Sequence, residues 1–271
     1  MNGASSHTGL SVQPDGTRTV HRTLPDEVAV AMVFNGSTQA VMMATPADIT
    51  DLAHGFALTE GVITDLSQIE SFEITDHPNG IEARFWITPD RADALSTRRR
   101  FMAGPVGCGL CGIDSLDQAN RPLPQVSNPA LRFSRADIAN ATDALRNLQP
   151  LHDQTHAAHA AGFLRPGAGI VMAREDVGRH NALDKLIGAM ARAGITPTNG
   201  AFVMTSRLSI ELIQKCAIAG APALIAVSAP TAAAVALANA AGITLAAFAR
   251  GGGFDIYSQP HRITTEVPHV A

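Results

Sequence analysis

The chain has 271 residues, of which 46% are hydrophobic and 16% are charged, and its formal net charge is −4. This composition is typical of a globular protein with a substantial core and excludes a disordered chain. A small negative charge gives no overall attraction to nucleic acid, so we expect no nucleic-acid partner, and any anion site must be local. The 3 cysteines are too few for a disulfide framework, which favours a reducing compartment.

Two stretches invite a targeting or membrane interpretation, and neither supports it. Residues 1–22 are polar and rich in Gly, Ser and Thr, without the apolar run of a signal peptide, so we expect a flexible tail. The stretch from Cys216 to Ala249 carries no charge, but Gly, Pro, Ser and Asn interrupt it repeatedly. Buried strands and a covered helix explain that stretch better than a bilayer does, so we expect no membrane span.

Residues 23–119 predict a smaller α+β domain that ends in a glycine-rich loop. Val28 to Phe34 and Gln39 to Ala44 have the composition of strands, and Asn35-Gly36 between them is typical of a tight hairpin turn. Thr45-Pro46 opens a helix. The other expected elements of this domain are strands at 72–75 and 81–88 and a short charged helix at 90–100.

Residues 131–271 predict a second, α/β domain, which follows a proline-containing linker at 120–130. A helix is expected at 134–148, with Ser134 as its N-cap. Strands and helices then alternate, which predicts a mainly parallel sheet covered by helices. The expected strands are 170–173, 201–204, 223–227, 244–248 and 254–257, and the expected helices are 180–193, 207–219 and 231–241.

Three loops of the second domain are candidates for anion binding. In open parallel sheets, ligands bind beyond the carboxyl ends of the strands, where loops meet helix N-termini. The loops in question offer hydroxyls, arginines and glycines, which suit phosphate groups. The candidate residues are Ser206, Arg207, Ser228, Arg250, Gly251, Gly252 and Gly253. Ordinary helix capping is the alternative, and it alone could account for Ser206.

Cys108 and Cys111 form a CxxC pair between glycines, with arginines at 98–100 upstream. Such a pair serves zinc binding, disulfide exchange and sulfur carriage. The surrounding glycines make a poor helix start, which disfavours thioredoxin-like exchange and favours a mobile loop that carries sulfur. A zinc site with nearby histidines is the alternative, although no second CxxC follows at zinc-finger spacing. The histidines in question are His152, His156 and His159.

The segment from Arg174 to Lys185 combines a charged loop with the start of a helix. A solvated cluster of ion pairs is the simplest interpretation of its charges. Together with other segments, however, it resembles a specific signature, that of the formate dehydrogenase accessory sulfurtransferases, or FdhD-type sulfur carriers. The resemblance runs in order from Glu27 to Tyr257. Its further segments are Asn35-Gly36, Met42 to Pro46, Gly107 to Gly112, Ser206 to Lys215 and Ala226 to Pro230.

This resemblance implies a cytidine-deaminase-like C-terminal domain, a smaller N-terminal domain and a cytoplasmic homodimer. It implies that Cys108 carries a persulfide received from a cysteine desulfurase, and that Cys111 assists. The sulfur would pass to the molybdenum cofactor, bis(molybdopterin guanine dinucleotide), before insertion into formate dehydrogenase, with GDP as a partial mimic and no zinc. The implied cofactor-binding segment is Phe248, Ala249, Arg250, Gly251, Gly252 and Gly253.

One segment departs from the pattern of that family. Its members usually carry Thr-Gly-Gly-x-His-Ala-Ala, whereas Thr155 to Ala161 here keeps the histidine and lacks the glycines. A close backbone approach at this point is therefore in doubt. The third cysteine, Cys216, matches no family role and is expected to be a small buried hydrophobe. Besides zinc binding, a chaperone that only holds the cofactor remains an alternative function.

Overall fold

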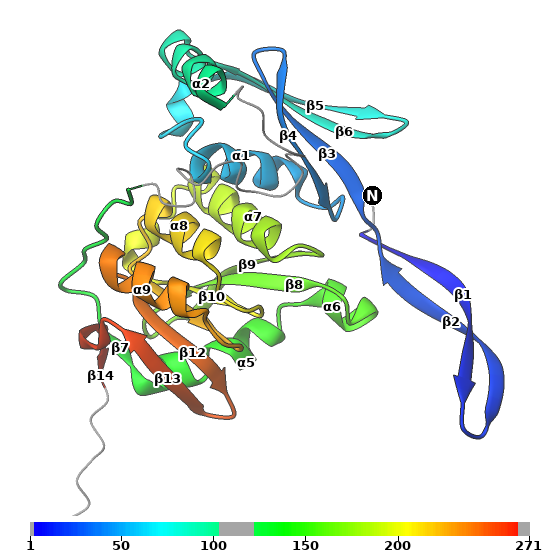
Figure 1. The fold of residues 1–271 in the computed structure, drawn as a ribbon. Coiled ribbons are helices and arrows are strands. Elements are labelled where there is room, and N and C mark those ends of the chain that lie inside the picture. The colour runs from blue at the N-terminus through cyan, green and yellow to red at the C-terminus, as the bar shows by residue number, and fades with distance from the viewer. Residues whose placement is uncertain (1–2, 103–121, 265–271) are drawn as a thin grey trace, which may run out of the picture.

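The computed structural model describes residues 3–102 and 122–264, with the backbone alone for 98–102. The CxxC pair, Cys108 and Cys111, lies outside these ranges. The described chain has two parts, each with its own sheet, and a separate N-terminal hairpin (Figure 1). We call residues 28–102 the N-terminal part and residues 122–264 the C-terminal part.

The N-terminal part is a four-stranded sheet with a helix on one face. Its strands are β3 (Val28–Phe34), β4 (Ser37–Ala44), β5 (Ile69–His77) and β6 (Gly80–Ile87), in the order β4-β3-β6-β5. Alternate residues of β3, namely Val30, Met32 and Phe34, are buried together with α1 (Ile49–Thr59), as the period of two requires. The expected Asn35-Gly36 turn is present, with φ 46° and 76°. A short helix η1 (Leu66–Gln68) and α2 (Pro89–Met102) complete this part.

The C-terminal part is a six-stranded sheet with helices on both faces (Figure 1). Its strands are β8 (His159–Arg165), β9 (Gly169–Asp176), β10 (Ala201–Met204), β11 (Ala223–Ala226), β12 (Thr244–Arg250) and β13 (Gly253–Ser258). Along β10, Phe202 and Met204 face one hydrophobic core while Ala201 and Val203 face another. Both faces of the central strands are therefore buried, which explains their continuous apolar runs.

The helices divide between those two faces. One core contains α7 (Arg179–Arg192), α8 (Ile210–Ala219) and α9 (Ala232–Ala241), and the other contains α4 (Arg135–Ala139) and α5 (Ala141–Arg146). The helix α6 (Pro150–Thr155) precedes β8. The remaining elements are η2 (Pro197–Asn199), η3 (Pro260–Arg262) and the short pair β7 (Phe133–Ser134) and β14 (Ile263–Thr264). The expected α/β class with a smaller N-terminal part is confirmed.

Three expectations need correction. The larger sheet is mixed rather than mainly parallel: the pairs β10–β11 and β11–β12 are parallel, whereas β8–β9, β8–β10 and β12–β13 are antiparallel, and part of this difference is β8, a strand rich in Ala and Gly that was not expected. The helix expected at 134–148 is split at Asn140, the residue that separates α4 from α5.

The third correction concerns residues 1–22, which were expected to be a flexible tail. Residues 4–25 form a hairpin of β1 (Ala4–Gln13) and β2 (Gly16–Pro25), paired in register along its whole length. It extends away from the rest of the chain (Figure 1). Its base is fixed by Ser5 Oγ, which donates to Asp26 Oδ1 at 2.7 Å. Because its exposed faces lack the apolar alternation of a half-buried strand, hydrophobic periodicity does not reveal it.

The two parts meet where α1 packs against α7. A Cβ atom added to Gly55 of α1 would lie 1.8 Å from the main-chain oxygen of Asp184. One added to Gly188 of α7 would lie 1.9 Å from the oxygen of Asp51. The two helix backbones therefore approach more closely than any side chain allows, and glycine is required on both. This contact ties the N-terminal sheet to the C-terminal one.

Candidate functional site

A cavity of about 520 Å³ lies in the C-terminal part. Thr205 directly follows β10, Val227 directly follows β11, and Arg250 is the last residue of β12. These three strands are parallel, so their carboxyl ends come together at this edge of the sheet, as the sequence predicts for a ligand site. The lining residues are Thr142, Asp143, Arg146, Gln149, His152, His156, Ala157, Ala158, His159, Val177, Thr205, Val227 and Arg250.

The lining is rich in groups that bind anions. Arg146 and Arg250 contribute guanidinium groups, and three histidines contribute imidazole rings. Among the lining residues the one carboxylate is Asp143, so positive and neutral donors predominate. Arginine and helix-terminal or histidine donors suit a phosphate or diphosphate group, for which the fork of the guanidinium is well shaped.

Two of the histidines are fixed by neighbouring groups. The ring Nδ1 of His152 lies 3.1 Å from the carbonyl oxygen of Ala158, and because a carbonyl only accepts, Nδ1 is the donor. The ring Nδ1 of His159 lies 3.4 Å from Thr205 Oγ1. Burial lowers the pKa of His159, and the positive charge of Arg179 lowers it further. At neutral pH His159 is therefore a neutral hydrogen-bonding group rather than a cation.

His156 has an unusual backbone. It ends α6 with φ 54° and ψ 22°, the left-handed conformation that glycine adopts most easily. It is also the residue that stands where the resembled family has its first glycine. This position therefore combines a glycine-type backbone with a side chain, and the side chain lines the cavity. Its ring lies edge-on to that of His152, with centroids 5.6 Å apart.

The predicted strand-end residues divide into one that lines the cavity and several that flank it. Arg250 is part of the lining. Ser206 is 3% exposed, and its hydroxyl donates to the carbonyl oxygen of Arg207. The N-cap of α8 is Ser209, so Ser206 does not cap that helix. Gly251 and Gly252, with φ 59° and 79°, form the two-residue turn between β12 and β13. The other flanking residues are exposed Arg207 and Phe248, part-buried Ser228, buried Ala249 and exposed Gly253.

Part of the lining was not identified from the sequence. Thr142, Asp143, Arg146 and Gln149 come from α5 and the turn after it. From the sequence this region was expected only to form a helix, and the buried residues of α5 include Leu145. The four-residue spacing of Thr142 and Arg146 indicated a second, polar face. This face lines the cavity because α5 packs against the sheet, where Leu145 lies among residues of β8, β10, β11 and β12.

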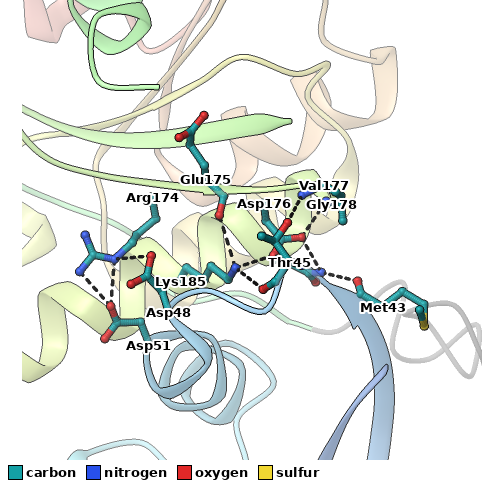
Figure 2. Close-up of polar contacts among 11 residues, drawn as sticks. Met43, Thr45, Asp48, Asp51, Arg174, Glu175, Asp176, Val177, Gly178 and Lys185 are labelled. Atoms are coloured by element: carbon teal, nitrogen blue, oxygen red, sulfur yellow. Dashed lines mark hydrogen bonds and ion pairs between the residues drawn. The ribbon is translucent and has the colours of Figure 1, made fainter. Parts of the chain in front are cut away.

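The signature segment forms the junction between the two parts, next to the cavity (Figure 2). The carboxylate of Asp176 is fully buried and lies 2.6 Å from Lys185 Nζ, which is also fully buried. The same carboxylate accepts hydrogen bonds from the main-chain N–H of Thr45 at 3.0 Å and of Gly178 at 2.8 Å. Asn181 Nδ2 donates both to Asp176 and to the carbonyl oxygen of Met43. Asp176 and Lys185 are therefore a buried, fully hydrogen-bonded ion pair, and not part of the solvated cluster that the charges of this segment suggested.

A second buried pair involves Asp184, the residue that precedes Lys185 in α7. Lys215 Nζ of α8 lies 2.9 Å from Asp184 Oδ2 and 2.9 Å from Glu60 Oε1. Thr59 Oγ1 donates to Asp184 Oδ1 at 2.8 Å. Burial raises the pKa of Asp184, although Lys215 opposes the shift. Burial acts to lower the pKa of Lys215, but Asp184 and Glu60 outweigh it and raise that pKa.

Neither a metal site nor a membrane helix appears among the described residues. Within 3–102 and 122–264, no group of three or more His, Cys, Asp or Glu side chains is arranged to hold a metal ion. In the same residues, no helix is both long and apolar enough to cross a membrane. Cys216 is fully buried with a raised pKa because of that burial, as expected of a small hydrophobe.

Comparisons with known proteins agree with the resemblance seen in the sequence. Residues 25–264 match the model of the FdhD/NarQ family. A protein of Agrobacterium fabrum named sulfur carrier protein FdhD is 51% identical over 245 residues, which cover 90% of each chain. One of Brucella abortus with the same name is 49% identical over 94% of each chain.

A solved structure has the same fold. It is the crystal structure of a putative formate dehydrogenase accessory protein from Desulfotalea psychrophila, with a TM-score of 0.76 and 23% identity. The match covers 96% of this chain and 99% of the other. At this identity the likeness shows the fold, while the family follows from the sequence matches along nearly the whole chain. The chain belongs to the FdhD/NarQ family.

Proposed function

We propose that the chain is a sulfur carrier needed for formate dehydrogenase activity. It accepts sulfur from a cysteine desulfurase as a persulfide on Cys108, with assistance from Cys111. It then passes this sulfur to bis(molybdopterin guanine dinucleotide) before the cofactor enters formate dehydrogenase. The observation that carries the proposal is the 51% identity, over 90% of both chains, to a protein named sulfur carrier protein FdhD. The CxxC pair supplies the thiol chemistry that such a carrier needs.

The loading step is a thiol exchange. The thiolate of Cys108 attacks the terminal sulfur of the persulfide on the donor enzyme. A new sulfur–sulfur bond forms on Cys108, the old one breaks, and the donor cysteine leaves as a thiolate. The step needs no external oxidant or reductant, because one sulfur–sulfur bond replaces another. The product on Cys108 is a reversible persulfide.

The cavity is the proposed site for the guanine nucleotide end of the cofactor, which is the substrate of the carrier. Arg250 and Arg146 would bind the diphosphate of the nucleotide, and the histidines would form hydrogen bonds with its uncharged polar groups. Gly251 to Gly253 lie next to Arg250 at the same edge of the sheet. The carrier is proposed to work in the cytoplasm as a homodimer, with the desulfurase as sulfur donor and formate dehydrogenase as cofactor acceptor.

Mass spectrometry tests the loading step. The purified chain is incubated with a cysteine desulfurase and cysteine, and its peptides are analysed without reductant. We expect an added mass of about 32 Da, one sulfur atom, on Cys108, and no adduct in Cys108→Ala. Cys216→Ala is the matched control, because the fully buried Cys216 is shielded from the donor. An adduct that persists in Cys108→Ala and disappears in Cys216→Ala contradicts the proposal.

Two further measurements separate the alternative functions. Metal analysis of the purified chain should find no stoichiometric zinc, and a full equivalent of zinc would support a zinc protein instead. In a strain that lacks its own carrier, the wild-type chain should restore formate dehydrogenase activity and Cys108→Ala should not. Restoration by Cys108→Ala would mean that the chain acts only as a cofactor-binding chaperone.

A further inference from the structure

All residues that line the cavity come from positions 142–250, in the C-terminal part. Two stretches of this lining are held by adjacent carboxylates that do not line the cavity themselves, those of Glu175 and Asp176 at the end of β9. Successive side chains of a strand point to opposite faces, so the two carboxylates hold different elements. Figure 2 shows Glu175 and Asp176 with their side chains directed apart.

Glu175 holds α6, the helix that carries the cavity residue His152 and is followed by His156. Its carboxylate oxygens accept the main-chain N–H groups of Leu151 at 2.8 Å and His152 at 2.9 Å. These N–H groups lie in the first turn of α6, where they have no partner within the helix. Glu175 thus fixes the start of α6 from within the C-terminal part.

Asp176 connects the turn after β9 to the N-terminal part. One of its oxygens accepts the N–H of Gly178 in this turn, and the other accepts the N–H of Thr45, the residue that follows β4. Thr45 returns a contact to the same turn, because its Oγ1 accepts the N–H of Val177 at 3.1 Å. Its carbonyl oxygen accepts a hydrogen bond from Lys185 Nζ at 3.0 Å. Thr45 is fully buried, so water cannot replace these partners.

We propose that Thr45 is a positioning residue for the nucleotide cavity: by accepting the N–H of Val177 it fixes the cavity wall that Val177 forms, so the N-terminal part sets the affinity of a site it does not line. This inference rests on the proposed binding of a guanine nucleotide in the cavity. Its physical basis is that ligand contacts depend on wall positions to within about 1 Å. An irregular turn has no helix or sheet hydrogen bonds of its own to hold it.

The structure offers a closely matched control in Thr59. It is also fully buried, also belongs to the N-terminal part, and also contacts a buried Asp–Lys pair across the junction. Its partners, Asp184 and Lys215, lie within regular helices and are not part of the cavity lining. Thr59→Val therefore removes a comparable hydroxyl at the same junction without releasing a cavity wall.

The experiment compares Thr45→Val and Thr59→Val in the full chain. Calorimetry with GDP measures affinity, and thermal unfolding measures stability. We expect both variants to lower Tm by about 2–5 °C, as the loss of buried hydrogen bonds requires in a chain of this size. Thr45→Val should weaken GDP binding about tenfold, while Thr59→Val should change it less than about twofold. Thr45→Ser, which keeps the hydroxyl, should bind GDP as the wild type does.

The outcomes distinguish this inference from the proposed function. Wild-type protein that does not bind GDP contradicts the nucleotide site itself. Wild-type binding with equal weakening in Thr45→Val and Thr59→Val contradicts the positioning role alone, because it would show a general effect of destabilisation. Weak binding by Thr45→Ser contradicts it as well. If Thr45→Val does not fold, Thr45→Ala removes the same acceptor with a smaller side chain and is judged by the same outcomes.

Discussion

The two buried Asp–Lys pairs at the junction are alike in charge and burial but differ in what surrounds them. Asp176 and Lys185 contact mainly main-chain groups, those of Thr45 and of the turn at Gly178. Asp184 and Lys215 contact side chains at the end of α1, those of Thr59 and Glu60. The first pair fixes the path of an irregular turn, whereas the second joins helices whose backbones are already fixed. Similar buried ion pairs can therefore position a turn at one place in the fold and stabilise helix packing at another.

The largest effect should come from breaking the second pair. Lys215→Met leaves the buried carboxylate of Asp184 without its cation, which typically costs about 3–5 kcal/mol of the free energy of unfolding. Removing the cation also removes the interaction that opposes the upward shift in the pKa of Asp184. A carboxyl with a raised pKa takes up a proton as the pH falls, so the deficit of the variant should shrink at acidic pH.

Urea unfolding of Lys215→Met and wild type at pH 7.5 and 5.5 measures this deficit. The folded fraction of Lys215→Met should bind GDP with an affinity near that of wild type, since the second pair does not hold the cavity wall. A deficit that is unchanged between the two pH values would show that Asp184 stays ionised in the variant. A large loss of GDP affinity would remove the distinction between the two pairs.

The next effect tests whether the helices near the second pair are held by packing. Gly188→Ala places a Cβ atom 1.9 Å from the main-chain oxygen of Asp51, so α1 and α7 must separate. We expect a loss of about 1–3 kcal/mol in the free energy of unfolding, measured by urea titration. Gly9→Ala is the control, because its Cβ would meet only Val20 Cγ2 at 3.8 Å. Equal stabilities for the two variants would contradict the close helix contact.

The sequence predicted helices, strands and turns correctly where the local pattern and the tertiary environment agree. The apolar runs of β10 and β11 are buried on both faces, and Asn35-Gly36 forms the turn its composition favours. The strand β8 was missed because its Ala-Ala-Gly core lacks side chains of high strand propensity. Its pairing with β9 and β10 makes it a strand. Arg250 was placed at the ligand edge from strand order alone, whereas Arg146 reaches that edge through the packing of α5 on the sheet, which the sequence does not reveal.

The roles of the signature residues could not be predicted from spacing either. The charges between Arg174 and Lys185 suggested a solvated cluster of ion pairs. The partners that decide their role, Thr45 and Thr59, lie more than a hundred residues earlier in the chain. Only tertiary structure brings them to α7 and excludes water from the charges.

A smaller effect concerns pH and His180, near the start of α7. Its ring Nε2 lies 3.5 Å from Ser209 Oγ and 3.9 Å from Glu211 Oε2. Burial lowers the pKa of His180 to about 4, and Arg179 and Lys215 add to this shift. In the unfolded chain the ring takes up a proton near its ordinary pKa of 6.5, and in the folded chain it does not. Stability from this group is therefore complete above pH 6.5 and is lost as the pH falls toward 4.

The His180 side chain is 36% exposed, so solvent screening reduces this contribution to about 1–2 kcal/mol. His180→Gln removes the titrating group while it keeps a polar side chain. The variant should lose less stability than wild type between pH 7 and pH 4.5, as measured by urea unfolding at several pH values. Parallel pH profiles for the two proteins would contradict a half-buried His180 whose pKa is lowered by the fold.

The smallest effect distinguishes a residue that lines the cavity, His156, from one that positions its wall, Thr45. His156→Gly relieves a left-handed backbone with φ 54°, which should stabilise the chain by about 0.5–1 kcal/mol. It also removes a ring that lines the cavity, so GDP affinity should fall about two- to fivefold. Thr45→Val should lower stability and affinity together, whereas His156→Gly should raise one and lower the other. Thermal unfolding and calorimetry on the same preparations measure both quantities. A His156→Gly protein that is less stable than wild type would show that the ring packs against His152 more favourably than the backbone strain costs.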